Sequence, residues 1–433
     1  MPQCGLSGPE GDRLMTLRTR FLLTTLLAML AVALPRLRAQ TSGPVLYTGA
    51  RIITGQDRPP IEQGALLVDG GRLVRVGRAG DIKAPTGAQV VTLTGKTIIP
   101  ALIDTHAHPS TDREGLVRDL QRRAYFGVGA LMSLGTDKGD LAFQMRATVV
   151  PDGARFRTAG RGITTPEPGR SDVPYWVTTP EQARQAVREQ AALKVDLIKI
   201  WVDDRDGKYV KLSPPLYSAV IDESHAHGLK VTAHIFNLSD AKGLLAAGID
   251  AFAHGIRDVD VDAEVLALFK SHPRVVLVPN LPDRGVATDL SWVDGALPPA
   301  ELAKLQAGAV DHPEARAAFA LQARNLAALA RAGVTIALGT DGNTFYGAHQ
   351  ELEDMVIAGL TPAQALVAAT RNGAALLNLT DTGTLEAGKR ADFVVLDANP
   401  LDAIANTRRI HAVYLHGQPI DRAGLSAQWR GGR

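Results

Sequence analysis

The chain has 433 residues, of which 45% are hydrophobic and 21% are charged. This balance is typical of a globular protein with a large core and argues against an intrinsically disordered chain. The length exceeds that of a usual single domain, but it accommodates a large α/β barrel with a small additional domain.

The first 39 residues have the layout of a secretory signal peptide. Arg18 and Arg20 precede the apolar run 21–34, and Ala39 supplies a small residue for cleavage. Because about 20 apolar residues are needed to cross a bilayer, we expect this run to be cleaved rather than to anchor the protein. The sequence therefore predicts an exported protein, periplasmic or secreted. A retained N-terminal anchor is the alternative, and Met15 is an alternative start.

Removal of this leader leaves 42 basic and 43 acidic residues. A net charge near zero gives no electrostatic reason to bind nucleic acid or an acidic membrane surface. The single cysteine, Cys4, lies in the leader, which leaves the mature chain without a disulfide, a thiol nucleophile or a cysteine metal ligand. We therefore expect a small-molecule substrate, no nucleic-acid partner and no stable membrane anchor after cleavage. A homo-oligomer is left open.

Short β-like runs occur at both ends of the mature chain. They cover residues 45–53, 65–68 and 72–76 near the start, and 392–396 and 412–415 near the end. We therefore predict a small composite β-domain built from residues 40–97 and 385–433, around a central domain of residues 98–384.

In the central domain, apolar strand-like segments alternate with amphipathic helical ones, which is the pattern of a parallel α/β sheet. Eight such alternations favour a closed (β/α)8 TIM barrel over an open sheet, and no glycine-rich GxGxxG turn indicates a dinucleotide site. The proline-containing segment 279–313 is predicted to be an insertion after the seventh strand and a candidate lid. The strand candidates are 98–105, 128–134, 155–159, 196–201, 230–233, 251–253, 275–278 and 335–338.

Two histidines end the first of these strands, at the edge where a TIM barrel carries its reactive groups. His106 and His108 are two residues apart, so both imidazoles project from one face of the strand and can chelate one ion. His225 and His227 have the same spacing but lie in a predicted helix, where the two side chains diverge. We predict that this second pair is a solvated surface pair.

Polar residues end three further strands. Asp341 follows the eighth strand, where a carboxylate can complete the ion held by the first two histidines and accept a proton from metal-bound water. His234 and His254 end the fifth and sixth strands and are suited to hold a second ion. Each side chain alone is more often a hydrogen-bonded core residue or a cap. Their recurrence at strand ends is much harder to explain as packing.

Lys199 lies inside the apolar strand 197–201. Burial there would lower its pKa and leave a neutral amine, which can add carbon dioxide to give a carbamate, N6-carboxylysine. The two oxygens of such a group can bridge two cations. The alternative is a lysine paired with Asp203 or Asp204, which would favour a mononuclear site.

This set of residues resembles the amidohydrolase superfamily in its binuclear, carboxylated-lysine form. The similarity extends over residues 45–420. Within the superfamily, the chain is similar to the branch of imidazolonepropionase-like and Xaa-Pro dipeptidase-like proteins, which includes ochratoxin-hydrolysing enzymes. The resemblance rests on Thr105-His106-Ala107-His108, Lys199, His234, Ala253-His254-Gly255 and Gly339-Thr340-Asp341, and on the flanking segments 99–104, 160–163 and 383–402.

The resemblance implies a metal-dependent hydrolase that cleaves a carbon–nitrogen bond in a small molecule. The expected substrate carries a peptide-like or N-acyl amino acid amide, as for a dipeptidase or a carboxypeptidase-like amidase. The nucleophile would be a hydroxide bridging two divalent ions, and zinc is the expected metal given the histidine and carboxylate ligands.

Three residues after the third and fourth strands are candidate substrate-binding residues, since they lie on the side where substrate must enter. They are Arg161, Arg170 and Tyr209. A lactone, ester or phosphotriester hydrolase on the same metal centre is the main alternative function. A mononuclear deaminase and a non-catalytic scaffold are the others.

Overall fold

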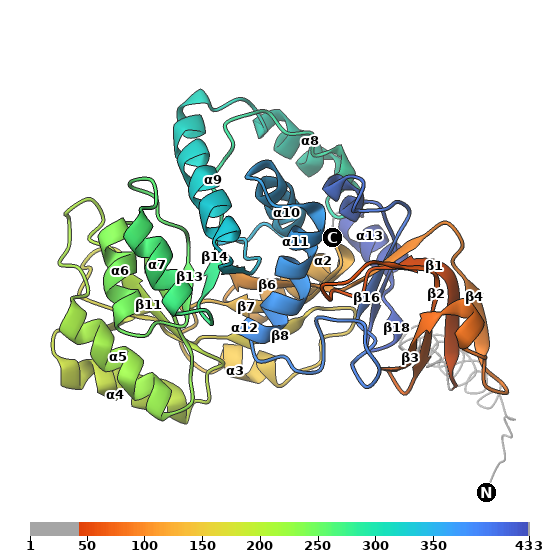
Figure 1. Cartoon of the computed structure of the whole chain (residues 1–433), viewed down its shortest axis with the longest axis horizontal. Coiled ribbons are helices and arrows are strands. Elements are labelled where there is room, and N and C mark those ends of the chain that lie inside the picture. The colour runs from red at the N-terminus through yellow and green to blue at the C-terminus, as the bar shows by residue number, and fades with distance from the viewer. Residues whose placement is uncertain (1–42, 432–433) are drawn as a thin grey trace, which may run out of the picture. The chain divides into compact units, whose positions relative to one another are not determined.

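A computed structural model describes residues 43–431 of the chain (Figure 1). The predicted signal peptide and its cleavage site lie outside the described residues. Among residues 43–431, no helix combines the length and the apolar character needed to span a membrane.

A mixed sheet of eight strands contains strands from both ends of the chain. Its order is β18-β17-β16-β5-β1-β2-β3, and β4 pairs with β1. The rings of Phe393 and Tyr414 stack at 4.5 Å, and Tyr47 packs edge-on against both, so N- and C-terminal strands share one aromatic core. The domain boundaries stay a prediction. The strands are β1 (Val45–Ile52), β2 (Ile61–Asp69), β3 (Arg72–Arg78), β4 (Gln89–Thr92), β5 (Thr97–Pro100), β16 (Phe393–Leu396), β17 (Ile410–Leu415) and β18 (Gln418–Pro419).

The first predicted strand, 98–105, is divided between two sheets, and its prediction as one strand is wrong in this respect. Its first part, β5, pairs with β1 and β16, whereas its second part, β6 (Leu102–Ala107), pairs with β7 (Val128–Ser133). The change occurs at Ala101, whose N–H donates to the carbonyl of Asp392. Pro100 has no N–H to donate, so the ladder is weakened where the chain crosses from one sheet to the other.

The remaining strands form two parallel sheets, and each of the eight predicted segments overlaps an observed strand. One sheet has the order β6-β7-β8, and the other β10-β9-β11-β12-β13-β14-β15. Backbone hydrogen bonds connect the two sheets, from Asp196 to Thr158 (3.0 Å) and from Thr105 to Leu338 (2.9 Å). Such bonds at both seams are what a TIM-barrel-type α/β fold requires. The strands not yet given are β8 (Arg155–Thr158), β9 (Ile163–Thr164), β10 (Tyr175–Trp176), β11 (Ile198–Val202), β12 (Val231–Ile235), β13 (Ala251–Ala253), β14 (Val276–Val278) and β15 (Thr335–Ile336).

Helices follow most of the parallel strands, and some of them begin at a residue whose side chain caps the helix. Thr179 accepts a hydrogen bond from the Gln182 N–H, and Pro180 occupies the first turn of α4. The helices are α2 (Arg113–Tyr125), α3 (Leu141–Arg146), α4 (Pro180–Ala192), α5 (Pro214–Ala226), α6 (Leu238–Ala246), α7 (Ala263–Ser271), α8 (Pro299–Gly308), α9 (Arg316–Arg331), α10 (Gly347–Ile357), α11 (Pro362–Val367), α12 (Gly373–Leu376) and α13 (Arg422–Arg430).

The predicted insertion 279–313 carries the helix α8, which lies near α13 (Figure 1). Buried residues of this segment, among them Val293 and Leu297, form one hydrophobic cluster with Tyr125 of α2 and Trp429 of α13. The segment is therefore tied to helices on the outside of the parallel strands. Its role as a lid stays a prediction.

Candidate metal centre

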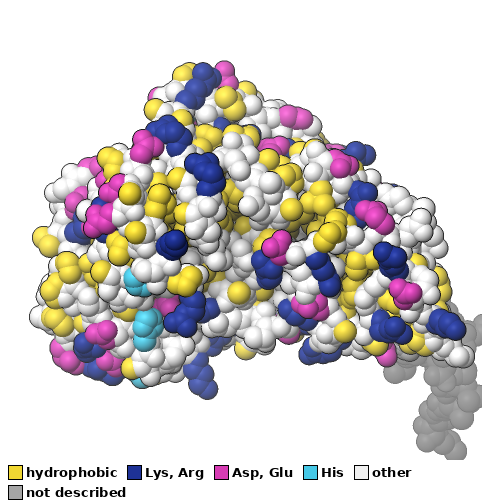
Figure 2. Space-filling model, viewed as in Figure 1, with side chains coloured by type: hydrophobic (Ala, Val, Ile, Leu, Met, Phe, Trp, Pro, Cys, Tyr) yellow, Lys and Arg dark blue, Asp and Glu magenta, His cyan; other side chains and the backbone are white. Residues whose placement is uncertain are grey.

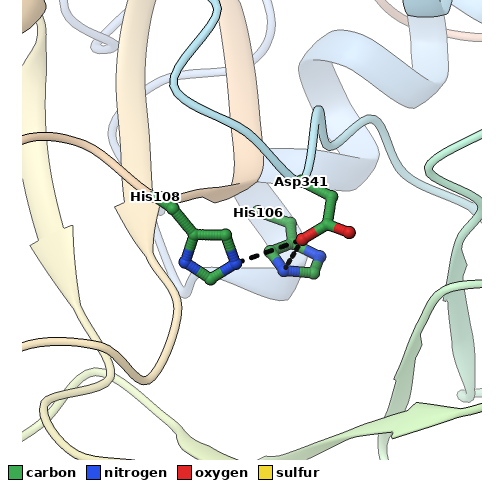
Figure 3. A group of neighbouring side chains, drawn as sticks. All are labelled: His106, His108 and Asp341. Atoms are coloured by element: carbon green, nitrogen blue, oxygen red, sulfur yellow. Dashed lines mark hydrogen bonds and ion pairs between the residues drawn. The ribbon is translucent and has the colours of Figure 1, made fainter. Parts of the chain in front are cut away.

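Three of the predicted ligands converge at the end of β6. The Asp341 Oδ1 lies 2.9 Å from the His106 Nε2 and 3.1 Å from the His108 Nε2 (Figure 3). The potential ligand atoms of the three residues all lie within 4.8 Å of one another. Two imidazoles and a carboxylate at this spacing can hold a divalent ion.

Backbone hydrogen bonds bring Asp341 to the two histidines. The N–H groups of Thr340 and Asp341 both donate to the carbonyl of His106, at 2.9 and 2.7 Å, and the His108 N–H donates to the carbonyl of Gly342. Asp341 has a φ of 51°, in the left-handed region that residues other than glycine rarely adopt. Strained backbone of this kind concentrates at functional sites because the surrounding structure must hold it.

The hydrogen bonds of His106 provide a test of whether these residues fit a metal. Its Nδ1 lies 3.0 Å from the Asn280 Oδ1, and its Nε2 faces the Asp341 carboxylate. A neutral imidazole has a single N–H, so an Nδ1–H that donates to Asn280 leaves a lone pair on Nε2. That lone pair would face an anionic oxygen unless a cation lies between them, and the donor set therefore fits a metal ion.

The other two predicted histidines continue this cluster. The ring centroids of His106 and His254 are 5.0 Å apart, and those of His254 and His234 are 4.6 Å apart. Burial lowers the pKa of His106 to about 4 and that of His234 to about 3, and it also lowers the pKa of His254. All three are thus neutral near pH 7, which is the form of histidine that binds metals.

Lys199 is buried beside these histidines, with 1% of its surface exposed. Its Nζ has no hydrogen-bond partner within the described part of the chain. Burial lowers the pKa of Lys199 to about 7, and the charges of Arg257 and Arg205 act in the same direction. The predicted burial of this lysine is therefore confirmed, and the alternative pairing with Asp203 or Asp204 is not observed.

Asp341 is ionised despite its surroundings. Burial alone would raise its pKa, but contacts with the imidazoles of His106 and His108 outweigh burial and hold the pKa below its ordinary range. About a third of the side chain, 35%, stays exposed, as does 31% of His108. Solutes can therefore reach this part of the site.

Three charged residues that the sequence interpretation did not place in the site surround His234. The His234 Nε2 lies 2.7 Å from the Asp203 Oδ2, 3.1 Å from the Arg205 Nη1 and 3.3 Å from the Arg257 Nη2. Interactions with His234 and Arg205 outweigh burial and lower the pKa of Asp203, so this carboxylate is ionised. An ionised carboxylate only accepts, which places the proton of His234 on Nε2 and leaves the Nδ1 lone pair free to bind a metal.

Asp203 is held in turn by Arg205. The Arg205 Nη1 lies 2.6 Å from the Asp203 Oδ2, and its Nε contacts Glu167 at 3.3 Å. Arg205 and Asp206 have φ values of 55° and 58°, so the loop after β11 is strained where it presents these groups. The position of Asp203 directly after the strand of Lys199 was the only sequence signal for its role.

The three candidate substrate-binding residues lie around the neighbouring loops. Arg161 donates to the carbonyls of Val173 and Pro174, and Arg170 pairs with Glu167 at 2.8 Å. The Tyr209 hydroxyl donates to the carbonyl of Pro168 at 3.2 Å. All three thus have partners among residues 167–174, and their role in substrate binding stays a prediction.

The second histidine pair lies on the surface, as predicted. His225 is in α5 and contacts Asp250 at 2.9 Å, whereas His227 directly follows the helix and contacts Glu223 at 3.4 Å. Both side chains are at least 40% exposed, and their partners differ. This pair therefore takes no part in the site.

Comparisons with known proteins agree with this architecture. Residues 170–420 match the model of the amidohydrolase family. The imidazolonepropionase of Deinococcus radiodurans is 31% identical over 391 residues, which cover 83% of this chain and 92% of the relative. A solved structure from Bifidobacterium longum, described as a prolidase, is 26% identical with a TM-score of 0.73 and covers 89% of this chain and 99% of its own. The A. niger ochratoxinase shares the fold at 22% identity, with a TM-score of 0.69 and coverage of 88% and 96%.

Proposed function

The chain belongs to the amidohydrolase family, and we propose that it is a metal-dependent hydrolase that cleaves an amide bond in a small molecule. One observation carries the proposal most directly, namely the convergence of His106, His108 and Asp341 within 4.8 Å. The family match and a relative named imidazolonepropionase support hydrolysis of carbon–nitrogen bonds as the class of reaction.

The residues present could hold two divalent ions, and zinc fits their histidine and carboxylate chemistry. His106, His108 and Asp341 would hold one ion, and the neutral His234 and His254 would hold the other. Bound ions of this kind lower the pKa of water and polarise a substrate carbonyl.

Lys199 is the residue best placed to link the ion held by His106, His108 and Asp341 to the ion held by His234 and His254. Its unpartnered, partly neutral amine fits carbamylation: the Nζ lone pair forms a bond to the carbon of carbon dioxide, and Nζ loses a proton. The product is an N6-carboxylysine whose anionic oxygens could contact both ions. Gly135 leaves room for the side chain of Lys199. A Cβ atom at position 135 would lie only 2.8 Å from the Lys199 Cγ.

Asp341 is the residue that we assign to proton transfer. Its carboxylate is ionised, partly exposed and held by backbone bonds to His106, so it can accept a proton from the attacking water at one oxygen. Returning that proton to the nitrogen of the leaving amine completes the hydrolysis without a covalent enzyme intermediate.

Small molecules remain the proposed substrates and nucleic acids are not proposed as partners. Basic and acidic side chains are interspersed over the face shown in Figure 2, without a broad basic region on that face. Peptide-like and N-acyl amino acid amides are the proposed class, while lactones, esters and phosphotriesters remain the competing substrates because the same metal centre suits them.

The experiment that tests this function is turnover by metal-loaded protein. Protein stripped with a chelator and reloaded with zinc is assayed on dipeptides, N-acyl amino acids, aryl esters and lactones, and bound metal is counted by mass spectrometry. We expect about two ions per chain and amide hydrolysis that disappears on stripping and returns on reloading. Full activity in stripped protein would contradict the proposal.

We also propose that the chain is exported and that its mature form begins near Gln40. The composition of residues 1–39 supports this proposal. Expression of the full chain followed by N-terminal sequencing tests it, and a mature protein that retains residues 22–34 would contradict it.

A further inference from the structure

Arg257 occupies a position beside the candidate metal centre that the proposed mechanism does not use. It follows His254 by three residues, and its Nη2 donates to the carbonyl of Ile235 at 2.8 Å. The same nitrogen lies 3.3 Å from the His234 Nε2. The side chain is half-buried, so its guanidinium group is at the border between the site and solvent.

In the described part of the chain, the carboxylates of Asp203 and Asp341 act on the charge of Arg257 only at longer range, without forming an ion pair with it. Within residues 43–431, no carboxylate lies within ion-pair distance of its guanidinium, whereas the adjacent Arg205 contacts both Asp203 and Glu167. The Arg257 Nε is buried, and no described residue forms a hydrogen bond with it. A half-buried cation with an unused donor is costly unless an anion completes it.

The surrounding site lacks acceptors rather than donors. Four buried nitrogen atoms there have no hydrogen-bond partner among residues 43–431: the Lys199 Nζ, the Arg205 Nη2, the Arg257 Nε and the Asn280 Nδ2. The nearby carboxylates are already engaged, Asp341 with histidines and Asp203 with His234 and Arg205. The carbamate proposed at Lys199 would supply an acceptor near Lys199 itself, but it would not provide an anion for the guanidinium of Arg257.

We propose that Arg257 binds a carboxylate of the substrate, so that the preferred substrates are anionic amides. This inference rests on the proposed function and narrows its substrate class. The planar guanidinium matches a carboxylate in geometry and charge. The ring of Phe236, which is 36% exposed, lies 5.3 Å from the Arg257 guanidinium carbon and supplies an apolar surface beside the charge. Uncharged lactones and phosphotriesters would not use this cation.

Matched ligands that differ only in charge test the proposal. N-benzenesulfonyl amino acids resist hydrolysis, and their binding to metal-loaded protein is compared with that of the corresponding primary amides by calorimetry. We expect each carboxylate to bind roughly 10- to 100-fold more tightly than its amide, as one charge-assisted interaction implies. Hydrolysis of N-benzoyl amino acids, succinanilate and uncharged butyranilide then shows whether the carboxylate belongs to the amine or to the acyl side of the scissile bond.

Substitutions of Arg257 test whether this residue causes the preference for carboxylate ligands. Arg257→Met should remove most of the carboxylate preference, and Arg257→Lys should keep part of it because the charge remains but the planar fork is lost. Arg324→Met removes one charge from α9, where Arg324 pairs with Asp260 on the surface, and should leave the preference unchanged. Thermal unfolding of each variant verifies that it is folded.

The outcomes separate this proposal from the proposed function. Equal binding of carboxylates and amides by the wild type, or an unchanged preference in a folded Arg257→Met variant, overturns the role of Arg257. Hydrolysis of charged and uncharged amides at equal rates would overturn it while supporting the hydrolase. Carboxylate binding that depends on Arg257 without hydrolysis of any amide would instead support it and contradict the hydrolase.

Discussion

The two halves of the candidate metal centre are built by different means. In the strand half, made of His106, His108 and Asp341, backbone hydrogen bonds between β6 and the loop after β15 set the positions of the ligands. The other half consists of Lys199 in β11, His234 in β12 and His254 directly after β13, and we call it the loop half because charged side chains from loops surround His234. Its lysine amine has no hydrogen-bond partner among the described residues. Backbone pairing therefore positions residues of both halves, but the orientation of His234 in the loop half also depends on side-chain charges. The carbamate proposed at Lys199 would add a further dependence on a chemical modification.

This difference predicts that the two proposed ions respond differently to substitution. Loss of a ligand from the strand half should remove one ion, and loss of Asp341 should also remove the group that moves the proton. Loss of a group from the loop half should weaken one ion and leave the strand half intact, because no backbone bond of Asp341 involves the loop half.

The largest effect is expected for His106→Ala and Asp341→Ala. Each variant removes a ligand of the strand half, and the second also removes the group that moves the proton, so turnover should fall by at least about 10³-fold. Steady-state kinetics and metal content measure the loss, and circular dichroism should show a retained fold because apolar strand residues supply the core. His225→Ala on the surface is the matched control. Near-normal turnover in Asp341→Ala would show that the proton is moved by another group.

Lys199→Ala should have the next largest effect. It removes the proposed bridge, so one ion should be lost and activity should fall by orders of magnitude. A short acid such as acetate or propionate should restore part of the activity by supplying carboxylate oxygens to the cavity, whereas methylammonium should not. Metal counting and rescue kinetics are the measurements.

The opposite result for Lys199 would be equally informative. Two tightly bound ions and near-normal rates in Lys199→Ala would make the lysine a structural residue and would leave the two halves without a shared ligand. The strand half and the loop half would then be two independent metal sites.

Asp203→Asn tests whether the loop half depends on the charge that orients His234. The amide can still accept one hydrogen bond but no longer pairs with Arg205 as an anion, so the orientation of His234 should loosen. We expect one ion to bind about 10- to 100-fold more weakly, as loss of an outer hydrogen-bond partner of a metal ligand implies. Chelator competition measures this affinity.

The neighbouring Asp204→Asn is the control for this variant. The Asp204 Oδ1 accepts a hydrogen bond from the Gly207 N–H and has no contact with His234 among the described residues. Its replacement should change neither ion. Equal weakening in both variants would indicate that the loop as a whole, and not the Asp203 carboxylate, supports His234.

Much of the fold and the central side chains could be predicted from the sequence because they follow simple periodicities. Parallel strands can be predicted from apolar runs in the sequence. A polar residue at the end of such a run is expected at the edge of the sheet where the carboxyl ends of the strands meet. This logic brought His106, His108, His254 and Asp341 together, and the structure places them within contact of one another.

The residues that were missed lie in loops or depend on distant contacts. Asp203, Arg205 and Arg257 reach His234 only because β11, β12 and β13 are adjacent in the sheet, and no local sequence pattern predicts that adjacency. The division of the first strand at Ala101 depends on pairing with β16, almost 300 residues later in the chain. Arg161, by contrast, lies in a loop after the third predicted strand, as expected for a substrate-binding residue. Its side chain nevertheless donates hydrogen bonds to the carbonyls of Val173 and Pro174.

The smallest effect is expected for Asn280, the residue that fixes His106 in the strand half. Asn280 has a φ of 46°, so Asn280→Ala would combine loss of the amide with backbone strain, whereas Asn280→Gly removes the amide and keeps the left-handed backbone accessible. In Asn280→Gly the imidazole of His106 loses the acceptor for its Nδ1–H. We expect one ion to bind about 10-fold more weakly, at the lower end for such partners, because the amide is neutral.

The strand half itself limits this effect. Asp341 and His108 keep their positions through backbone hydrogen bonds that do not involve Asn280, so two of the three ligands remain in place when His106 is free to turn. Asn280→Asp retains an accepting oxygen and should restore the affinity, which chelator competition measures alongside the Asp203 variants. A loss in Asn280→Gly that equals or exceeds the loss in Asp203→Asn would mean that the strand half also depends on a loop side chain, and the distinction between the two halves would fail.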